Sequence, residues 1–281
     1  MNQALPREQK PKRTLFHSNP VLSRLSKLDE RSDVNAATYA GIASKTTFFL
    51  AMTLLGMIAQ LLVMSALSGE PVWQTLTIYE KFTLALSQKE TVILGAVLVG
   101  GFVCELLGIF VRSTIPVTGA LYSVSQGYVI SFLVFKVLTG YEYLGLEALL
   151  LTVAVVLAMS WLYTSGIVKV DGKFRAVLLT LVLGSISVGL LGFVGSLIPA
   201  TRPYVQAMAQ NAGLSIALDV IGLVIAALFL ISDFAVIDEC VKEGYPSKYE
   251  WAAAFGLVFT VIWIYLKILD LLMQFAAKDK D

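Results

Sequence analysis

The fold class of this chain is decided by two long apolar stretches near its C-terminus, GLSIALDVIGLVIAALFLISDFAVIDEC (213–240) and WAAAFGLVFTVIWIYLKILDLLMQF (251–275). Each is long enough to cross a bilayer as a helix, which takes roughly 20 apolar residues. Both runs also contain ionisable side chains: Asp219, Asp233, Lys267 and Asp270. Charged groups are costly in hydrocarbon, so we expect these four to face the interior of a helix bundle and to pair with one another.

The rest of the chain is equally apolar. Of its 281 residues 57% are hydrophobic and only 15% are charged, whereas a soluble domain is about 25% charged. We therefore expect an all-α, polytopic membrane protein embedded in the lipid bilayer. Seven stretches are candidate spans: 46–67, 91–112, 118–138, 146–168, 175–198, 213–240 and 250–274. The third is the least apolar, and the sixth is longer than a span requires, so we expect its end to project into solvent.

Three regions follow from these spans. Residues 1–44 are predicted to form a basic cytosolic tail, with a short helix lying on the membrane surface after Pro20. Residues 45–275 form the transmembrane domain, and 276–281 a short C-terminal tail. Lys and Arg are more numerous in the segments on the same side as the N-terminus, which predicts a cytosolic N-terminus.

Small residues recur at helix-packing intervals in two of the spans. Ala96 and Gly100 lie four residues apart in the second span, and the fifth contains Ser185, Gly189, Gly192 and Ser196. Small residues at this spacing let two helix backbones approach closely. The pattern predicts close helix contacts through the second and fifth spans.

Composition and motifs argue against several classes of function. A net charge of +1 gives no sign of nucleic-acid binding. The single histidine, His17, lies in the tail, so the chain offers no firm metal site, and we expect no cofactor. The chain contains no HExxH, GxSxG or phosphate-binding glycine loop, so we predict that it is not an enzyme.

The charged residues of the last two spans allow two pairings. Asp219 and Asp233 lie on nearly one face of the sixth span, and Lys267 and Asp270 are neighbours on the seventh. Counted from the turn near Tyr245, Lys267 is closer in depth to Asp219 than to Asp233. The group is either a structural ion pair or a protonation-sensitive site on an ion path, and both readings stay open here.

The second span contains two further charged residues, Glu105 and Arg112, seven residues apart on one face. Arg112 lies near the predicted membrane boundary, where a long cationic side chain reaches the headgroups. Glu105 is therefore the better candidate for a second polar contribution to an ion path.

Four stretches carry a family resemblance: SNPVLSRL (18–25), ATYAGIASKT (37–46), GKFR (172–175) and AALFLISDFAVIDECVKEGYPSKYEWAAAFGLVFTVIWIYLKIL (226–269). With them the chain resembles the Bax inhibitor-1/YccA-like (TMBIM) family, in particular its longer bacterial branch. The resemblance implies six helices around a central seventh and a location in the bacterial inner membrane. It also implies a pH-sensitive leak of cations, calcium in particular, gated by two facing aspartates in the last two helices.

Asp233 matches the first of those aspartates, and Lys267 stands where the second is expected. The resemblance therefore predicts a gating pair of Asp233 and Lys267, in which the lysine gives Asp233 a permanent counter-charge and repels calcium. Asp270 restores an acidic partner only if the seventh helix is rotated, and Gln126 replaces an acid common in the family. A calcium leak, or a degenerate form of one, is the predicted activity. The alternative is an interaction protein without transport that modulates a membrane-bound protease or a stress response.

Overall fold

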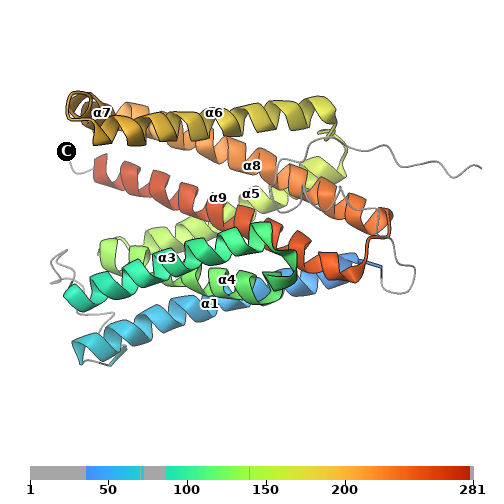
Figure 1. Cartoon of the computed structure of the whole chain (residues 1–281), viewed down its shortest axis with the longest axis horizontal. Helices are drawn as coiled ribbons and strands as arrows, with labels where there is room; N and C mark the ends of the chain where they lie inside the picture. The colour runs from blue at the N-terminus through green and yellow to red at the C-terminus, as the bar shows by residue number, and fades with distance from the viewer. Residues whose placement is uncertain (1–35, 70, 73–86, 139, 279–281) are drawn as a thin grey trace, which may run out of the picture.

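The computed structural model describes residues 36–69, 71–72, 87–138 and 140–278. Within these residues, seven helical segments are long and apolar enough to cross a membrane (Figure 1). Their helices are α1 (Tyr39–Ser68), α3 (Gln88–Phe110), α4 (Ile115–Phe132), α5 (Tyr143–Thr164), α6 (Gly172–Leu197), α8 (Ala212–Lys242) and α9 (Glu250–Lys278). The expected all-α, seven-span architecture is confirmed. The helix predicted in the basic tail falls among residues 1–35, outside the described residues.

Side-chain caps set the starts of four of these helices. Thr38, Asp171 and Asn211 each accept a hydrogen bond from a backbone N–H in the first turn of α1, α6 and α8. Ser87 and Glu90 form a reciprocal capping box at the start of α3. Between α6 and α8 lies a short helix that the sequence pattern did not predict, α7 (Arg202–Ala209), which begins with a proline in its first turn.

The third span is the least apolar because much of its surface faces protein. A 3-10 turn (Arg112–Thr114) precedes α4, and a π-helical turn (Leu133–Val137) extends it. Ser123 and Ser131 of α4 are fully buried. The Ser131 hydroxyl donates to Gln60 Oε1 of α1 at 2.8 Å, a partner that lipid cannot offer. Low hydropathy here reflects burial, not doubtful membrane insertion.

α9 is the central helix of the bundle. It packs against α1, α4, α5 and α8, and Figure 1 shows it running between the helices on either side. Its side chains Phe255, Val258 and Ile264 are fully buried. The expected central position of the seventh span is confirmed.

α1 and α4 cross with their backbones in direct contact. A Cβ atom on Gly127 would lie 2.7 Å from the carbonyl carbon of Thr53, and one on Gly56 would lie 2.8 Å from that of Val124. Real Cβ atoms do not approach backbone this closely, so glycine is required at both positions. The contact depends on Gly56 and Gly127, neither of which belongs to the predicted small-residue pairs.

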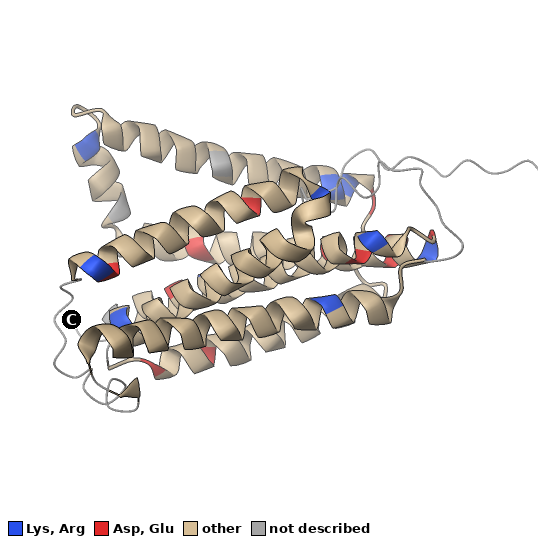
Figure 2. Ribbon diagram, turned by 60° about the horizontal axis from the view of Figure 1, so that its bottom comes forward, with Lys and Arg blue, Asp and Glu red and all other residues tan. Residues whose placement is uncertain are grey.

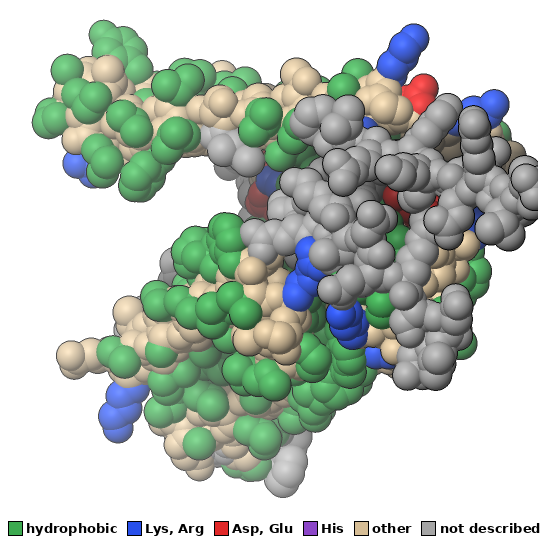
Figure 3. Space-filling view, turned by 45° about the vertical axis from the view of Figure 1, so that its right-hand side comes forward, with side chains coloured by type: hydrophobic (Ala, Val, Ile, Leu, Met, Phe, Trp, Pro, Cys, Tyr) green, Lys and Arg blue, Asp and Glu red, His purple; other side chains and the backbone are tan. Residues whose placement is uncertain are grey.

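α6 packs on α8 near its own start and then stands apart. Leu178 packs with Ile225 and Phe229 of α8, whereas Leu191 and Phe193, nearer the end of α6, are exposed. In the space-filling view an apolar arm is separated from the rest of the molecule by a hollow (Figure 3), at the edge where Figure 1 places α6 and α7.

The close contacts predicted at Gly100, Gly189 and Gly192 are not formed, although α3 does approach α4 closely at Gly101, where an added Cβ atom would lie 3.0 Å from the Cβ atom of Ser125. A Cβ atom added to Gly100, Gly189 or Gly192 would meet nothing within 4 Å. The prediction was wrong because the spacing of small residues does not say which face of a helix meets protein and which meets lipid.

The last turns of α8 before Lys242 pack against the other helices, and whether this end leaves the membrane stays a prediction. Val236 and Cys240 belong to the main hydrophobic core. Asp238 accepts hydrogen bonds from Tyr39 of α1 and Tyr163 of α5. The extra length of this helix is used to join α1, α5 and α8 at one end of the bundle.

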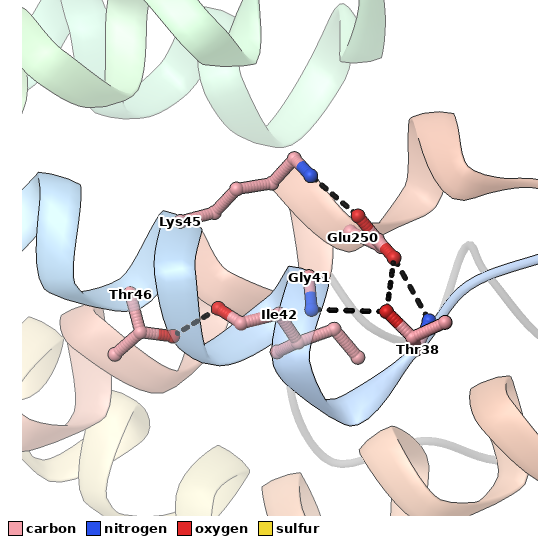
Figure 4. A network of polar contacts seen from close by, with 6 residues as sticks. All are labelled: Thr38, Gly41, Ile42, Lys45, Thr46 and Glu250. Carbon is pink, nitrogen blue, oxygen red and sulfur yellow. Dashed lines mark hydrogen bonds and ion pairs between the residues drawn. The ribbon is translucent and has the colours of Figure 1, made fainter.

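Glu250, the first residue of α9, ties the start of α1 to the start of the central helix (Figure 4). Its carboxylate accepts hydrogen bonds from the backbone N–H of Thr38 (2.8 Å) and the Thr38 hydroxyl (3.2 Å), and it forms an ion pair with Lys45. Beside it, Ala37 donates a backbone hydrogen bond to Tyr245. We call Thr38, Lys45 and Glu250 the clasp, and the end of the bundle that holds it the clasp end.

We expect Glu250→Ala to lower the free energy of unfolding by about 2–3 kcal/mol, since it removes hydrogen bonds to a charged group and leaves Lys45 unpaired. Glu250→Gln keeps an oxygen for Thr38 and should lose less. Thermal unfolding in detergent measures both, with the exposed Glu147→Gln as control. Equal melting temperatures for Glu250→Ala and the wild type would show that the clasp adds no stability.

Candidate functional site

Few charged residues lie along the middle of the bundle, and most gather at its two ends (Figure 2). Away from the clasp end, α8 and α9 bring together Asp219, Lys267, Asp270 and Gln274, which we call the α8–α9 cluster. Lys267 Nζ donates to Asp219 Oδ1 at 2.7 Å, and Gln274 Nε2 donates to Asp219 Oδ2 at 2.6 Å. Both carboxylate oxygens of Asp219 are thus engaged by donors from α9.

Helical spacing explains why α9 supplies three members of the cluster. Lys267, Asp270 and Gln274 are three and four residues apart and so follow one another along one face. Asp270 interacts with Asp219, Lys267 and Gln274. The cluster contains two carboxylates and one ammonium group, and it therefore has one more acidic than basic group.

Gly222 makes room for the lysine side chain. A Cβ atom at this position would lie 3.3 Å from Cε and 3.8 Å from Nζ of Lys267. Gly222 lies one helical turn from Asp219, so the aliphatic stem of Lys267 crosses the bare backbone of α8 on its way to the carboxylate.

Asp233 lies elsewhere, in the core between α8 and α9. Its side chain is completely buried, and its Oδ2 accepts a hydrogen bond from the Thr260 hydroxyl at 2.5 Å. Thr260 also donates to the backbone carbonyl of Gly256 at 3.2 Å. Asp233 and Asp219 are fourteen residues apart on α8, which separates them by about 21 Å along the helix axis.

The structure corrects the expected pair of Asp233 and Lys267, because the ion pair of Lys267 is with Asp219. Two antiparallel helices joined by a short turn place residues at equal distances from the turn opposite each other. Counted from Tyr245, Thr260 is at nearly the depth of Asp233, and Lys267 at nearly that of Asp219. Whether Asp233 or Lys267 senses pH stays a prediction.

Glu105 and Arg112 are not members of the α8–α9 cluster. Glu105 is half-buried on α3 and interacts with Tyr122 of α4. The Arg112 guanidinium lies over the ring of Tyr249, 5.4 Å from its centroid, near the turn between α8 and α9. A polar path that includes Glu105 would therefore run beside α4, and one that includes Arg112 would run at the clasp end.

Sequence reasoning missed Thr260 and Gln274. Both are uncharged residues in an apolar helix, so charge alone does not identify them. The four-residue spacing of Gln274 from Asp270 indicates that the two share a helix face, and the distance of Thr260 from Tyr245 indicates that it lies opposite Asp233. It also missed the pairs at the clasp end, where Arg175 of α6 contacts Glu239 at 3.4 Å and Lys242 contacts Asp238 at 2.6 Å.

Among the described residues, His, Cys, Asp and Glu nowhere form a group of three or more that could hold a metal ion. The two cysteines, Cys104 and Cys240, are both free thiols.

Comparison with known proteins gives one match. The model of the family described as Bax inhibitor 1 like matches residues 19–277. The chain therefore belongs to this family and is a multi-pass integral membrane protein. No curated protein and no solved structure matches the chain.

Proposed function

We propose that this protein lets cations, calcium among them, leak slowly and pH-dependently across the bacterial inner membrane, without catalysing a reaction. The observation that carries the proposal is the placement of ionisable groups at two depths between α8 and α9. Asp233 is wholly buried near Thr260, and the α8–α9 cluster lies about 21 Å further along. Ionisable groups inside membrane-spanning helices mark ion or proton pathways more often than structural sites.

In this proposal the described structure is the closed state of the pathway. Side chains of the central helix fill the bundle, and the clasp joins α1 to α9 at one end. Near the other end of the bundle, the ammonium group of Lys267 pairs with the carboxylate of Asp219 and would repel an entering cation. Opening requires α8 and α9 to separate, and protonation of Asp233 would change the hydrogen bond with Thr260 that joins them.

The proposed orientation places the clasp end in the cytosol. Several cationic residues lie at or near that end on the connections and helix ends, including Lys169, Lys173, Arg175, Lys242 and Lys248. An excess of Lys and Arg on one side of the membrane is typical of the cytosolic side.

Calcium flux into liposomes that contain a calcium dye tests this function. We expect a weak flux from the wild type that depends on pH, a flux increased severalfold by Lys267→Asp, and a loss of pH dependence in Asp233→Asn. Lys267→Asp replaces a repelling ammonium group by a carboxylate, which attracts calcium. The exposed Glu147→Gln is the matched control and should behave as the wild type.

The absence of flux from both the wild type and Lys267→Asp, with insertion into the liposomes verified, would contradict the leak. That outcome would favour the alternative of a non-transporting protein that modulates a membrane-bound protease or a stress response.

A further inference from the structure

The α8–α9 cluster is a set of oxygen atoms around a positive charge. Asp219 and Asp270 supply carboxylates, and the charge in their midst is the ammonium group of Lys267. One further oxygen is available, because Oε1 of Gln274 is buried and has no hydrogen-bond partner. The orientation of this amide follows from its contact with Asp219, since a carboxylate accepts hydrogen bonds and Nε2 is the donating atom.

We infer that Asp219, Asp270 and Gln274 form a cation-binding site that the protein's own Lys267 ammonium group occupies. The inference rests on the proposed function in that it explains how Lys267 regulates cation entry at the same cluster. Its evidence is the contacts of the cluster, and its test measures binding and not flux.

The ligand class follows from the donor atoms. Carboxylate and amide oxygens are the ligands that hard cations such as calcium prefer. An ammonium group satisfies the same acceptors with hydrogen-bond donors, and here it lies 2.7 Å from Asp219. Two carboxylates left without Lys267 form a doubly negative site, whose charge a divalent cation balances.

The lysine outcompetes free cations because it is tethered. A group held beside its partner by the fold has a high effective concentration, so a free ion must displace it before it binds. The glycine at 222 lets the lysine stem lie against α8, and a side chain there would crowd Cε of Lys267. This arrangement keeps the ammonium group in place in the wild type.

Lys267 is the more exposed partner of the ion pair: its side chain is 29% exposed, compared with 12% for that of Asp219. In the inferred site, an uncharged side chain at position 267 leaves the Asp219 carboxylate free to bind a cation.

The test is the effect of millimolar calcium chloride on the melting temperature of the purified full chain in detergent, at constant ionic strength. A ligand that binds only the folded state raises the melting temperature. We expect calcium to raise the melting temperature of Lys267→Met by several degrees and to leave that of the wild type unchanged. The double variant Lys267→Met/Asp219→Asn should lose the calcium response.

Lys136→Met is the matched control. Lys136 is also a buried lysine, and it forms an ion pair with Glu90 at 2.9 Å. This variant tests whether the loss of any buried lysine is enough to give a calcium response, and calcium should not stabilise it. If Lys267→Met does not fold, Lys267→Gln keeps an amide donor for Asp219 and serves in its place.

Three results would overturn the inference: no calcium response in either folded Lys267 variant, an equal response in the wild type, or an equal response in Lys136→Met. Failure of the leak is a separate result. If calcium stabilises Lys267→Met while no variant conducts, the cation site stands and the proposed transport does not.

Discussion

Gly127→Ala is expected to lower the free energy of unfolding by about 3 kcal/mol or more, which is at the upper end of the range for overpacking. We expect no other glycine-to-alanine change in this protein to cost more. The added Cβ atom would lie 2.7 Å from the carbonyl carbon of Thr53 on α1. That neighbour is backbone and cannot rotate away as a side chain can. The two helices must therefore move apart, and the contacts around their crossing are lost with them.

Thermal unfolding in detergent, together with the fraction of monodisperse protein after purification, measures this effect. Gly189→Ala is the matched control, because it adds the same methyl group to α6, where nothing lies within 4 Å. It should be neutral or raise stability by up to about 1 kcal/mol, since alanine favours helix over glycine. Equal melting temperatures for the two variants would show that α1 and α4 do not cross as described.

Thr260→Val is the second large effect that we expect, a loss of about 2–3 kcal/mol. The change is nearly isosteric, but it removes the hydroxyl that donates to Asp233 at 2.5 Å. A hydrogen bond to a buried carboxylate is worth about 1.5–3 kcal/mol, and the acceptor here is completely buried. A hydrogen bond to an ionised carboxylate is stronger than one to a neutral acid, so the loss should be greatest where Asp233 is ionised.

Thr260→Ser separates the hydroxyl from its methyl group. It keeps the donor and should retain the wild-type dependence of stability on pH, with only a small loss of packing. The measurement is the melting temperature of the three proteins across a range of pH. A Thr260→Val variant as stable as Thr260→Ser at every pH would show that the contact with Asp233 is not a stabilising one.

The pairing of Lys267 shows how a family resemblance and a simple count of depth can disagree. The resemblance assigned Asp233 and Lys267 to facing positions, whereas the distances from Tyr245 favoured Asp219. The structure follows the distances, because antiparallel helices joined by a short turn are held in register by that turn. Depth was therefore the more reliable guide to contacts within this helix pair.

Helix contacts elsewhere could not be predicted in this way. Membrane-spanning helices are apolar on every side, so their sequences do not mark the face that meets protein. Gly100 and Gly189 matched a packing pattern but have open space around them, while Gly56 and Gly127 make the close contact. The difference lies in how each helix is rotated, which depends on all of its neighbours at once.

The amino-acid sequence alone predicts the architecture: seven apolar helices, with charged groups in the last two. Hydrocarbon leaves little choice, because every backbone group must be hydrogen-bonded within its own helix and the membrane sets the length of the span. The three-dimensional structure was needed to establish that Lys267 pairs with Asp219 and that Asp233 accepts a hydrogen bond from Thr260. These contacts depend on the register and rotation of α8 against α9. That arrangement is set by the packing energy of the whole interface and not by any one residue.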